Sequence, residues 1–104
     1  VRACLEPLSE LLSRVDDLLL SIDLDAMRMD VAPAVSFQSK SGMLPSQLFP
    51  ILHQVAKSRK LRQLEIMEYN PDFEEYNVNF SPVTAHLVFD ILQQLFNFRE
   101  THKI

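Results

Sequence analysis

The sequence predicts an α/β fold with a parallel sheet, containing at least two strands and three helices. Segments whose apolar residues recur at helical spacing alternate with short apolar runs, in the order helix, strand, long loop, helix, strand, loop, helix. Strands that alternate with helices pair in parallel through right-handed crossovers. The 104 residues, of which 47% are hydrophobic, are enough for one domain or for part of one.

The chain opens on a helix and a strand. A helix is predicted over residues 3–15, because apolar side chains follow one another at helical spacing there: Leu5, Leu8, Leu11, Leu12 and Val15. A strand follows at about residues 17–23. Its run "LLLSI" is too continuous for a half-exposed strand, so we expect it to be buried on both faces. Residues 24–44 show no periodicity, and so long a loop in a compact domain is usually functional.

The second helix is predicted from Pro45 through about Lys60. Proline is tolerated in the first turn of a helix, where its missing N–H would have no partner. Pro50 would also have to lie early in the helix, which leaves a start nearer Phe49 as an alternative.

A second strand lies in "LRQLEIMEYNP", whose centre is apolar and whose end is acidic, at Glu68. The Asn-Pro pair at its end breaks it. Residues 72–80 form another loop. Ser81 as a helix cap, followed by Pro82, starts the last helix. Two parallel strands alone make a poor sheet, so we expect further strands to lie outside this chain.

Composition excludes several classes of partner. Ten Lys and Arg residues against fourteen Asp and Glu residues leave a net charge of −4, which offers no electrostatic footprint for nucleic acid or an anionic membrane. No window approaches the apolar length of a membrane span. The single cysteine, Cys4, cannot form an internal disulfide, which indicates the cytoplasm. The chain begins with Val1 on a helical pattern, so we expect a longer parent protein.

Acidic side chains follow both predicted strands. Asp23 and Asp25 are two residues apart, and residues i and i+2 of a strand point to the same side. Glu68 follows the second strand, and the carboxyl ends of parallel strands share one edge of the sheet. Three carboxylates in one place repel and need a cation or a cationic ligand, and oxygen ligands suit Mg²⁺ or Mn²⁺. The alternative is that the aspartates cap turns at the strand end.

The stretch "LLLSIDLD" also looks like the opening motif of the haloacid-dehalogenase-type phosphatases, which use an aspartate nucleophile. In that motif a Thr or Val and usually a Gly follow closely, whereas Ala26, Met27 and Arg28 follow here. An aspartate-nucleophile phosphatase is therefore an alternative function.

The combination of motifs resembles the C-terminal portion of the ureohydrolase family, which comprises arginases, agmatinases and formimidoylglutamases. In that family a strand ends in Asp-x-Asp, a loop with Ala-Pro follows, and a later strand ends in Glu-x-Asn-Pro. The stretches "SIDLDAMRMDVAPAVS" and "LEIMEYNP" contain all of these in the same order, and the tail "SPVTAHLVFDILQQLF" is similar to the family's closing helix. The resemblance covers about residues 15–97.

The resemblance implies that residues 1–104 are a single partial domain, the C-terminal part of a three-layer α-β-α fold. It implies that Asp23 and Asp25 ligate a centre of two manganese ions and that Glu68 holds the guanidinium or amidinium group of a small-molecule substrate. The remaining ligands, a His and an Asp-x-His-x-Asp cluster, would come from outside this chain. No catalytic residue beyond these ligands is assigned. A homo-oligomer is expected.

Within the family, "MRMDVAPAVS" looks most like the formimidoylglutamase branch, which hydrolyses N-formimidoyl-L-glutamate to glutamate and formamide in histidine degradation. Ala34 and Glu65 stand where that branch commonly has Gly and Asp, so arginase-like and agmatinase-like substrates stay open. A third alternative is a non-catalytic fragment that associates with itself through its exposed sheet edges. The histidines are not assigned to the metal: His53, His86 and His102.

Overall fold

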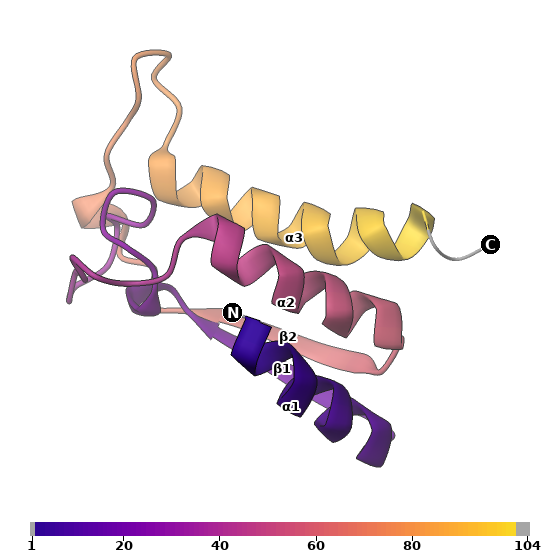
Figure 1. Cartoon of the computed structure of the whole chain (residues 1–104). Coiled ribbons are helices and arrows are strands. Elements are labelled where there is room, and N and C mark those ends of the chain that lie inside the picture. The colour runs from indigo at the N-terminus through magenta and orange to yellow at the C-terminus, as the bar shows by residue number, and fades with distance from the viewer. Residues whose placement is uncertain (1, 102–104) are drawn as a thin grey trace.

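Within residues 2–101, which the computed structural model describes, two strands and three α-helices follow one another in the predicted order (Figure 1). The elements are α1 (Arg2–Arg14), β1 (Leu18–Asp23), the 3₁₀ turn η1 (Leu24–Ala26), α2 (Pro45–Ser58), β2 (Leu61–Met67), the 3₁₀ turn η2 (Pro71–Phe73) and α3 (Val83–Thr101). The α/β class is confirmed. His102 lies outside the described residues.

The two strands pair in parallel, as the alternation of strands and helices predicts. Leu20 lies opposite Leu64, and Ile22 lies opposite Ile66. One irregularity separates the pairing of Leu18 from that of the residues after it. Because the strands run in the same direction, both of their carboxyl ends emerge at one edge of the sheet.

One face of this sheet is covered and the other is open. Ile22 is buried and Leu20 packs against the hydrophobic core, whereas Leu19 is 52% exposed and Met67 is 44% exposed. The prediction that the first strand is buried on both faces was therefore wrong for the described part of the chain. The run is continuous in sequence, but α2 packs over a single face and the other described elements leave the opposite face in solvent.

Helix α2 lies at the centre of the helical layer, between α1 and α3 and in contact with β2 (Figure 1). The core joins it to α3 through buried apolar side chains: Leu48, Leu52, Val55 and Ala56 from α2, and Leu87, Ile91 and Leu95 from α3. None of the helices within residues 2–101 is both long enough and apolar enough to cross a bilayer.

Helix α2 begins at Pro45, so the alternative start nearer Phe49 was wrong. The backbone N–H of Leu44 donates to the side-chain oxygen of Gln47 at 2.9 Å, which satisfies a donor just before the first turn. Pro45 needs no hydrogen-bond acceptor in that turn, and Pro50 is accommodated inside the helix.

The loop over residues 24–44 is folded back on itself rather than structureless. The backbone N–H of Arg28 donates to the carbonyl of Met43 at 2.9 Å, and the N–H of Met43 donates to the carbonyl of Ala26 at 2.9 Å. The middle of the loop, residues 32–35, is buried, and Ala32 and Val35 belong to the hydrophobic core. The loop after the first strand is therefore a packed layer of the domain.

The single glycine, Gly42, lies where two backbone segments of this loop meet. A Cβ atom at this position would stand 2.5 Å from the carbonyl carbon of Met27 and 2.7 Å from the carbonyl oxygen of Ala26. These are backbone atoms that cannot swing aside, so only a residue without a side chain fits here.

We predict that Gly42→Ala lowers the free energy of unfolding by about 1–3 kcal/mol, because the added methyl group forces the paired backbones apart. Chemical denaturation measures the change. Ser41→Ala, one residue earlier and exposed, is the matched control and should leave the stability unchanged. Equal stability of Gly42→Ala and wild type would contradict this reading of the loop.

The amino end of α3 is capped by a side chain from the preceding loop. The carboxylate of Glu74 accepts the backbone N–H groups of Thr84 at 3.0 Å and of Ala85 at 3.1 Å, and the hydroxyl of Tyr69 donates to it at 2.9 Å. The prediction that Ser81 caps this helix was wrong, because these amides, the ones a cap would satisfy, are taken by Glu74.

Burial acts to raise the pKa of Glu74, but hydrogen bonds from Thr84, Tyr69 and Ala85 outweigh it, so the pKa lies below its ordinary value. A carboxyl group whose pKa is lower in the folded state stabilises the fold above its unfolded pKa. That stabilisation is lost as the pH falls through the folded pKa.

We therefore predict that Glu74→Ala lowers the free energy of unfolding by about 1 kcal/mol at neutral pH, the usual cost of losing a helix cap. The difference in the free energy of unfolding between Glu74→Ala and wild type should disappear as the pH falls below the ordinary pKa range of glutamate. Denaturation at a series of pH values measures it, with the exposed neighbour Glu75→Ala as control. A gap that stays constant with pH would contradict a cap by the ionised carboxylate.

Candidate functional site

Asp23 and Asp25 lie together at the carboxyl end of β1. The strand ends at Asp23, and the carboxylate of Asp23 accepts the backbone N–H of Asp25 at 3.2 Å, which caps the turn η1. The turn, and not strand alternation as we predicted, brings the two acids to the same place. The alternative reading of Asp23 as a turn cap is confirmed, and this cap also directs the Asp23 side chain toward Asp25.

Glu68 joins this pair from the neighbouring strand. Asp23 pairs with Met67 in the sheet, so Glu68 follows β2 directly at the edge where β1 ends. Hydrogen bonding with the Asp23 side chain, partial loss of solvent, and the negative charges of Asp23 and Glu68 raise the pKa of Asp25. Asp25 thus lies close enough to both Asp23 and Glu68 for their charges to act on it.

The backbone at Glu68 adopts an unusual conformation, with φ of 72° in the left-handed region. For residues other than glycine such conformations cost about 1–3 kcal/mol and persist only where the surrounding structure holds them. They cluster at sites where a side chain must take a direction that ordinary backbone would not allow. Glu68 is such a residue, directly after an ordinary strand.

Asn70 ties the segment after β2 to the loop after β1. Its backbone N–H donates to the carbonyl of Ala34 at 2.7 Å, and its side-chain amide donates to the hydroxyl of Ser36 at 3.1 Å. Its side-chain oxygen accepts the backbone N–H of Asp72 at 3.1 Å and caps η2. The Asn-Pro element is therefore bonded to the two residues Ala34 and Ser36, which follow the Ala-Pro pair, and it lies next to the acidic edge.

Two charged residues of the loop, Arg28 and Asp30, form an ion pair. The guanidinium of Arg28 donates to the two carboxylate oxygens of Asp30, at 2.7 Å and 2.5 Å. Hydrogen bonding from Arg28 is the main cause that lowers the pKa of Asp30. Arg28 therefore does not reach the acids at the strand ends as their counter-ion, and their negative charge stays uncompensated by it.

The histidines of the described chain lie away from these acids. His53, on α2, is hydrogen-bonded to the side chain of Gln94, and His86 lies 3.5 Å from Asp90, both on α3. Within residues 2–101, no group of three or more His, Cys, Asp and Glu side chains is arranged to hold a metal ion. Two carboxylates at one edge nevertheless fit a hard cation by their donor chemistry, as part of a coordination shell.

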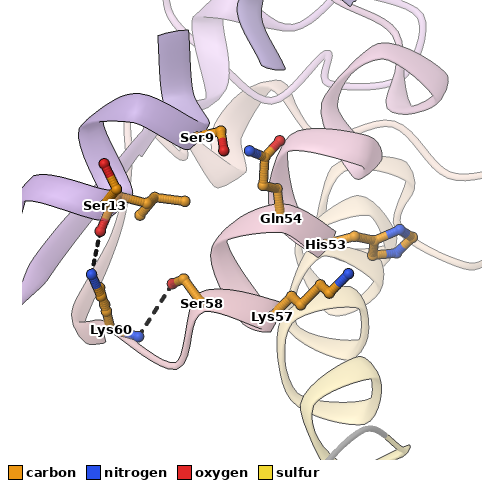
Figure 2. A pocket seen from close by; sticks show the side chains of 8 residues that line it. Ser9, Ser13, His53, Gln54, Lys57, Ser58 and Lys60 are labelled. Atoms are coloured by element: carbon orange, nitrogen blue, oxygen red, sulfur yellow. Dashed lines mark hydrogen bonds between the residues drawn. The ribbon is translucent and has the colours of Figure 1, made fainter. Parts of the chain in front are cut away.

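A cavity of about 570 Å³ opens between α1 and α2 (Figure 2). Its lining consists of Ser9, Leu12, Ser13, His53, Gln54, Lys57, Ser58 and Lys60. Lys60 directly precedes β2, so the cavity lies at the amino end of that strand and the acids lie at the other end. Several of its polar groups bond to the protein itself: the ammonium group of Lys60 donates to the carbonyl of Leu12, and Gln54 donates to that of Leu5. The first bond joins α1 to the segment between α2 and β2, and the second joins α1 to α2.

Two residues close to the acidic edge of the sheet, Glu74 and Thr84, were not predicted from the sequence. Thr84 is fully buried, and its hydroxyl oxygen accepts the backbone N–H of Ala34 at 2.9 Å. The available signal was a threonine at the start of an otherwise apolar helix. Its partner is 50 residues away in sequence, so no local pattern identifies it.

Comparison with known proteins finds a matching family, related sequences and similar solved structures. Residues 1–96 match the model of the arginase family. The formimidoylglutamase of Aeromonas hydrophila is 33% identical over 91 residues, which cover 88% of this chain and 29% of that protein. That of Paraburkholderia xenovorans is 35% identical over 88 residues, covering 85% and 27%. The arginase of Bacillus caldovelox superposes with a TM-score of 0.77 at 26% identity, covering 91% and 30%. The chain spans less than a third of the length of these relatives.

We predict that Glu68→Gly does not destabilise the protein, because glycine adopts a positive φ at no steric cost. The free energy of unfolding should stay the same or rise by up to about 1 kcal/mol. Glu65→Gly, inside β2 where the backbone is ordinary, is the matched control and should lose about 0.5–1 kcal/mol. Equal destabilisation by the two glycines in chemical denaturation would contradict backbone strain at Glu68.

Proposed function

The chain belongs to the arginase family, and we propose that it supplies part of the active site of a metal-dependent hydrolase that splits a carbon–nitrogen bond of a linear amidine. N-formimidoyl-L-glutamate is the substrate that we favour, with glutamate and formamide as products. The support for this substrate is the similarity to formimidoylglutamases at 33% and 35% identity, together with the sequence of the loop after Asp25.

The observation that carries the proposal is the gathering of Asp23, Asp25 and Glu68 at one edge of the sheet, where Arg28, paired with Asp30, does not offset their charge. Hydrogen bonding with Asp23, loss of solvent and the negative charges of Asp23 and Glu68 together raise the pKa of Asp25. A bound cation would offset the negative charge of the two aspartates. A cationic substrate group does the same for Glu68.

We assign the residues as follows. Asp23 and Asp25 hold manganese, since their carboxylate oxygens suit a hard divalent ion. Manganese bound there would activate water for attack on the planar carbon of the substrate. Glu68 receives the amidinium group of the substrate through a charge-assisted hydrogen bond and holds its carbon next to the metal edge. Two ions are proposed for each complete site.

The remaining metal ligands are proposed to come from polypeptide outside these 104 residues, so residues 1–104 form a partial domain. The chain covers 29% of the Aeromonas relative, which is consistent with a partial site. We further propose a homo-oligomeric, cytoplasmic enzyme. Membership of the arginase family decides against the aspartate-nucleophile phosphatase.

We predict that a polypeptide extended upstream of Val1 hydrolyses N-formimidoyl-L-glutamate in the presence of manganese and that the 104-residue chain does not. Asp23→Asn and Asp25→Asn should each weaken manganese binding by at least about tenfold, since even substitutions around a ligand cost that much. Glu68→Gln should leave manganese binding intact and raise KM. Titration calorimetry and a formamide assay measure these effects.

The matched control is Asp16→Asn, an exposed acid just before β1, at the opposite edge of the sheet. It should change neither manganese binding nor turnover. Hydrolysis by the 104-residue chain alone would contradict a partial site, and unaltered manganese binding in Asp23→Asn would remove the ligand assignment. Arginine and agmatine belong in the same assay, because a preference for either would move the substrate to the guanidine branch. Inactivity of the extended polypeptide on all three substrates would favour a non-catalytic, self-associating chain.

A further inference from the structure

Thr84 is a fully buried polar residue with a hydrogen-bond partner on each side. Its hydroxyl oxygen accepts the backbone N–H of Ala34 at 2.9 Å. On the other side, its backbone N–H donates to the carboxylate of Glu74 at 3.0 Å. The buried hydroxyl of Thr84 therefore connects the amino end of α3 to the loop after β1.

The connection continues from Ala34 to the segment after β2. The carbonyl of Ala34 accepts the backbone N–H of Asn70 at 2.7 Å. The side chain of Asn70 donates to the hydroxyl of Ser36, two residues further along the same loop, at 3.1 Å. Residues 34–36 of the loop are therefore bonded to Thr84 on one side and to Asn70 on the other.

Glu68 lies between this contact and the sheet. Met67, before it, is fixed by pairing with Asp23, and Asn70, two residues after it, is fixed by Ala34. Between these two anchors, Glu68 keeps its φ of 72°. A left-handed residue other than glycine relaxes when one of its anchors is released, because the ordinary conformations are lower in energy.

We propose that Thr84 is a positioning residue for Glu68, acting through Ala34 and Asn70. Without the threonine hydroxyl, the N–H of Ala34 is a buried donor with no acceptor, and the loop shifts to satisfy it. Asn70 moves with the loop, and the direction of the Glu68 side chain is lost. The role of Glu68 toward substrate rests on the function proposed above, whereas the link from Thr84 to Glu68 does not.

The test uses Thr84→Val, which keeps the shape of the side chain and removes the hydroxyl, and Thr84→Ser, which keeps the hydroxyl. In the complete enzyme, Thr84→Val should raise KM by about tenfold, the equivalent of one lost hydrogen bond. Its kcat and its manganese affinity should change by less than about twofold, because within residues 2–101 no hydrogen bond joins Thr84 to Asp23 or Asp25. Thr84→Ser should restore the KM of the wild type.

Amide hydrogen exchange gives a readout independent of activity. In Thr84→Val the amides of Ala34 and Asn70 should exchange about tenfold faster, and in Thr84→Ser they should not. Leu87→Ala is the control for general destabilisation, since Leu87 is buried one turn further along α3. A matching rise of KM in Leu87→Ala would overturn the proposal, and so would unchanged exchange at Asn70 in Thr84→Val.

A second variant covers the case in which Thr84→Val does not fold. Ser36→Ala is an exposed change that removes only the contact to the Asn70 side chain. It should raise KM with kcat retained, and an unchanged KM would overturn the proposal. If the wild-type enzyme hydrolyses none of the amidine or guanidine substrates, the proposed function fails, and the exchange rates of Ala34 and Asn70 still decide the link to Thr84.

Discussion

The parallel pairing of β1 with β2 is the constraint on which the rest of this structure depends. It makes two strands that are separated by more than 35 residues end at the same edge, with Asp23 opposite Met67. An antiparallel pair would have sent Glu68 to the far end of the sheet. Everything that follows the strands, the turn η1, the folded loop and the Asn70 contact, is packed around that common edge.

Carboxylates gathered in this way are unfavourable by themselves, and the neighbouring backbone holds them there. Asp23 caps a turn that brings Asp25 beside it, and the left-handed backbone of Glu68 sets its place after the strand. The buried hydroxyl of Thr84 secures the loop from behind. Strained backbone and perturbed pKa values in one place are typical of functional sites.

The sequence predicts what depends on local patterns. Apolar spacing gave the helices and strands to within a few residues, and the joint motifs around Asp23 and Glu68 gave the family, which the match over residues 1–96 confirms. The cap of α3 by Glu74 and the contact of Thr84 with Ala34 were not predictable, because each joins residues that are distant in sequence. The first strand was predicted to be buried on both faces, but one face is open. An apolar run indicates that a strand can be buried, and it does not indicate whether this chain itself supplies the elements that cover both faces.

Manganese-induced broadening of backbone amide NMR signals tests most directly whether the two strand ends share one cation. Manganese is paramagnetic and broadens only nearby nuclei. We expect the amides of Asp25 and Tyr69, after β1 and β2, to broaden together at low metal concentration, while that of Leu61 at the other end of β2 stays sharp. Broadening of Asp25 without Tyr69, or broadening centred on the His86–Asp90 pair of α3, would contradict a shared site.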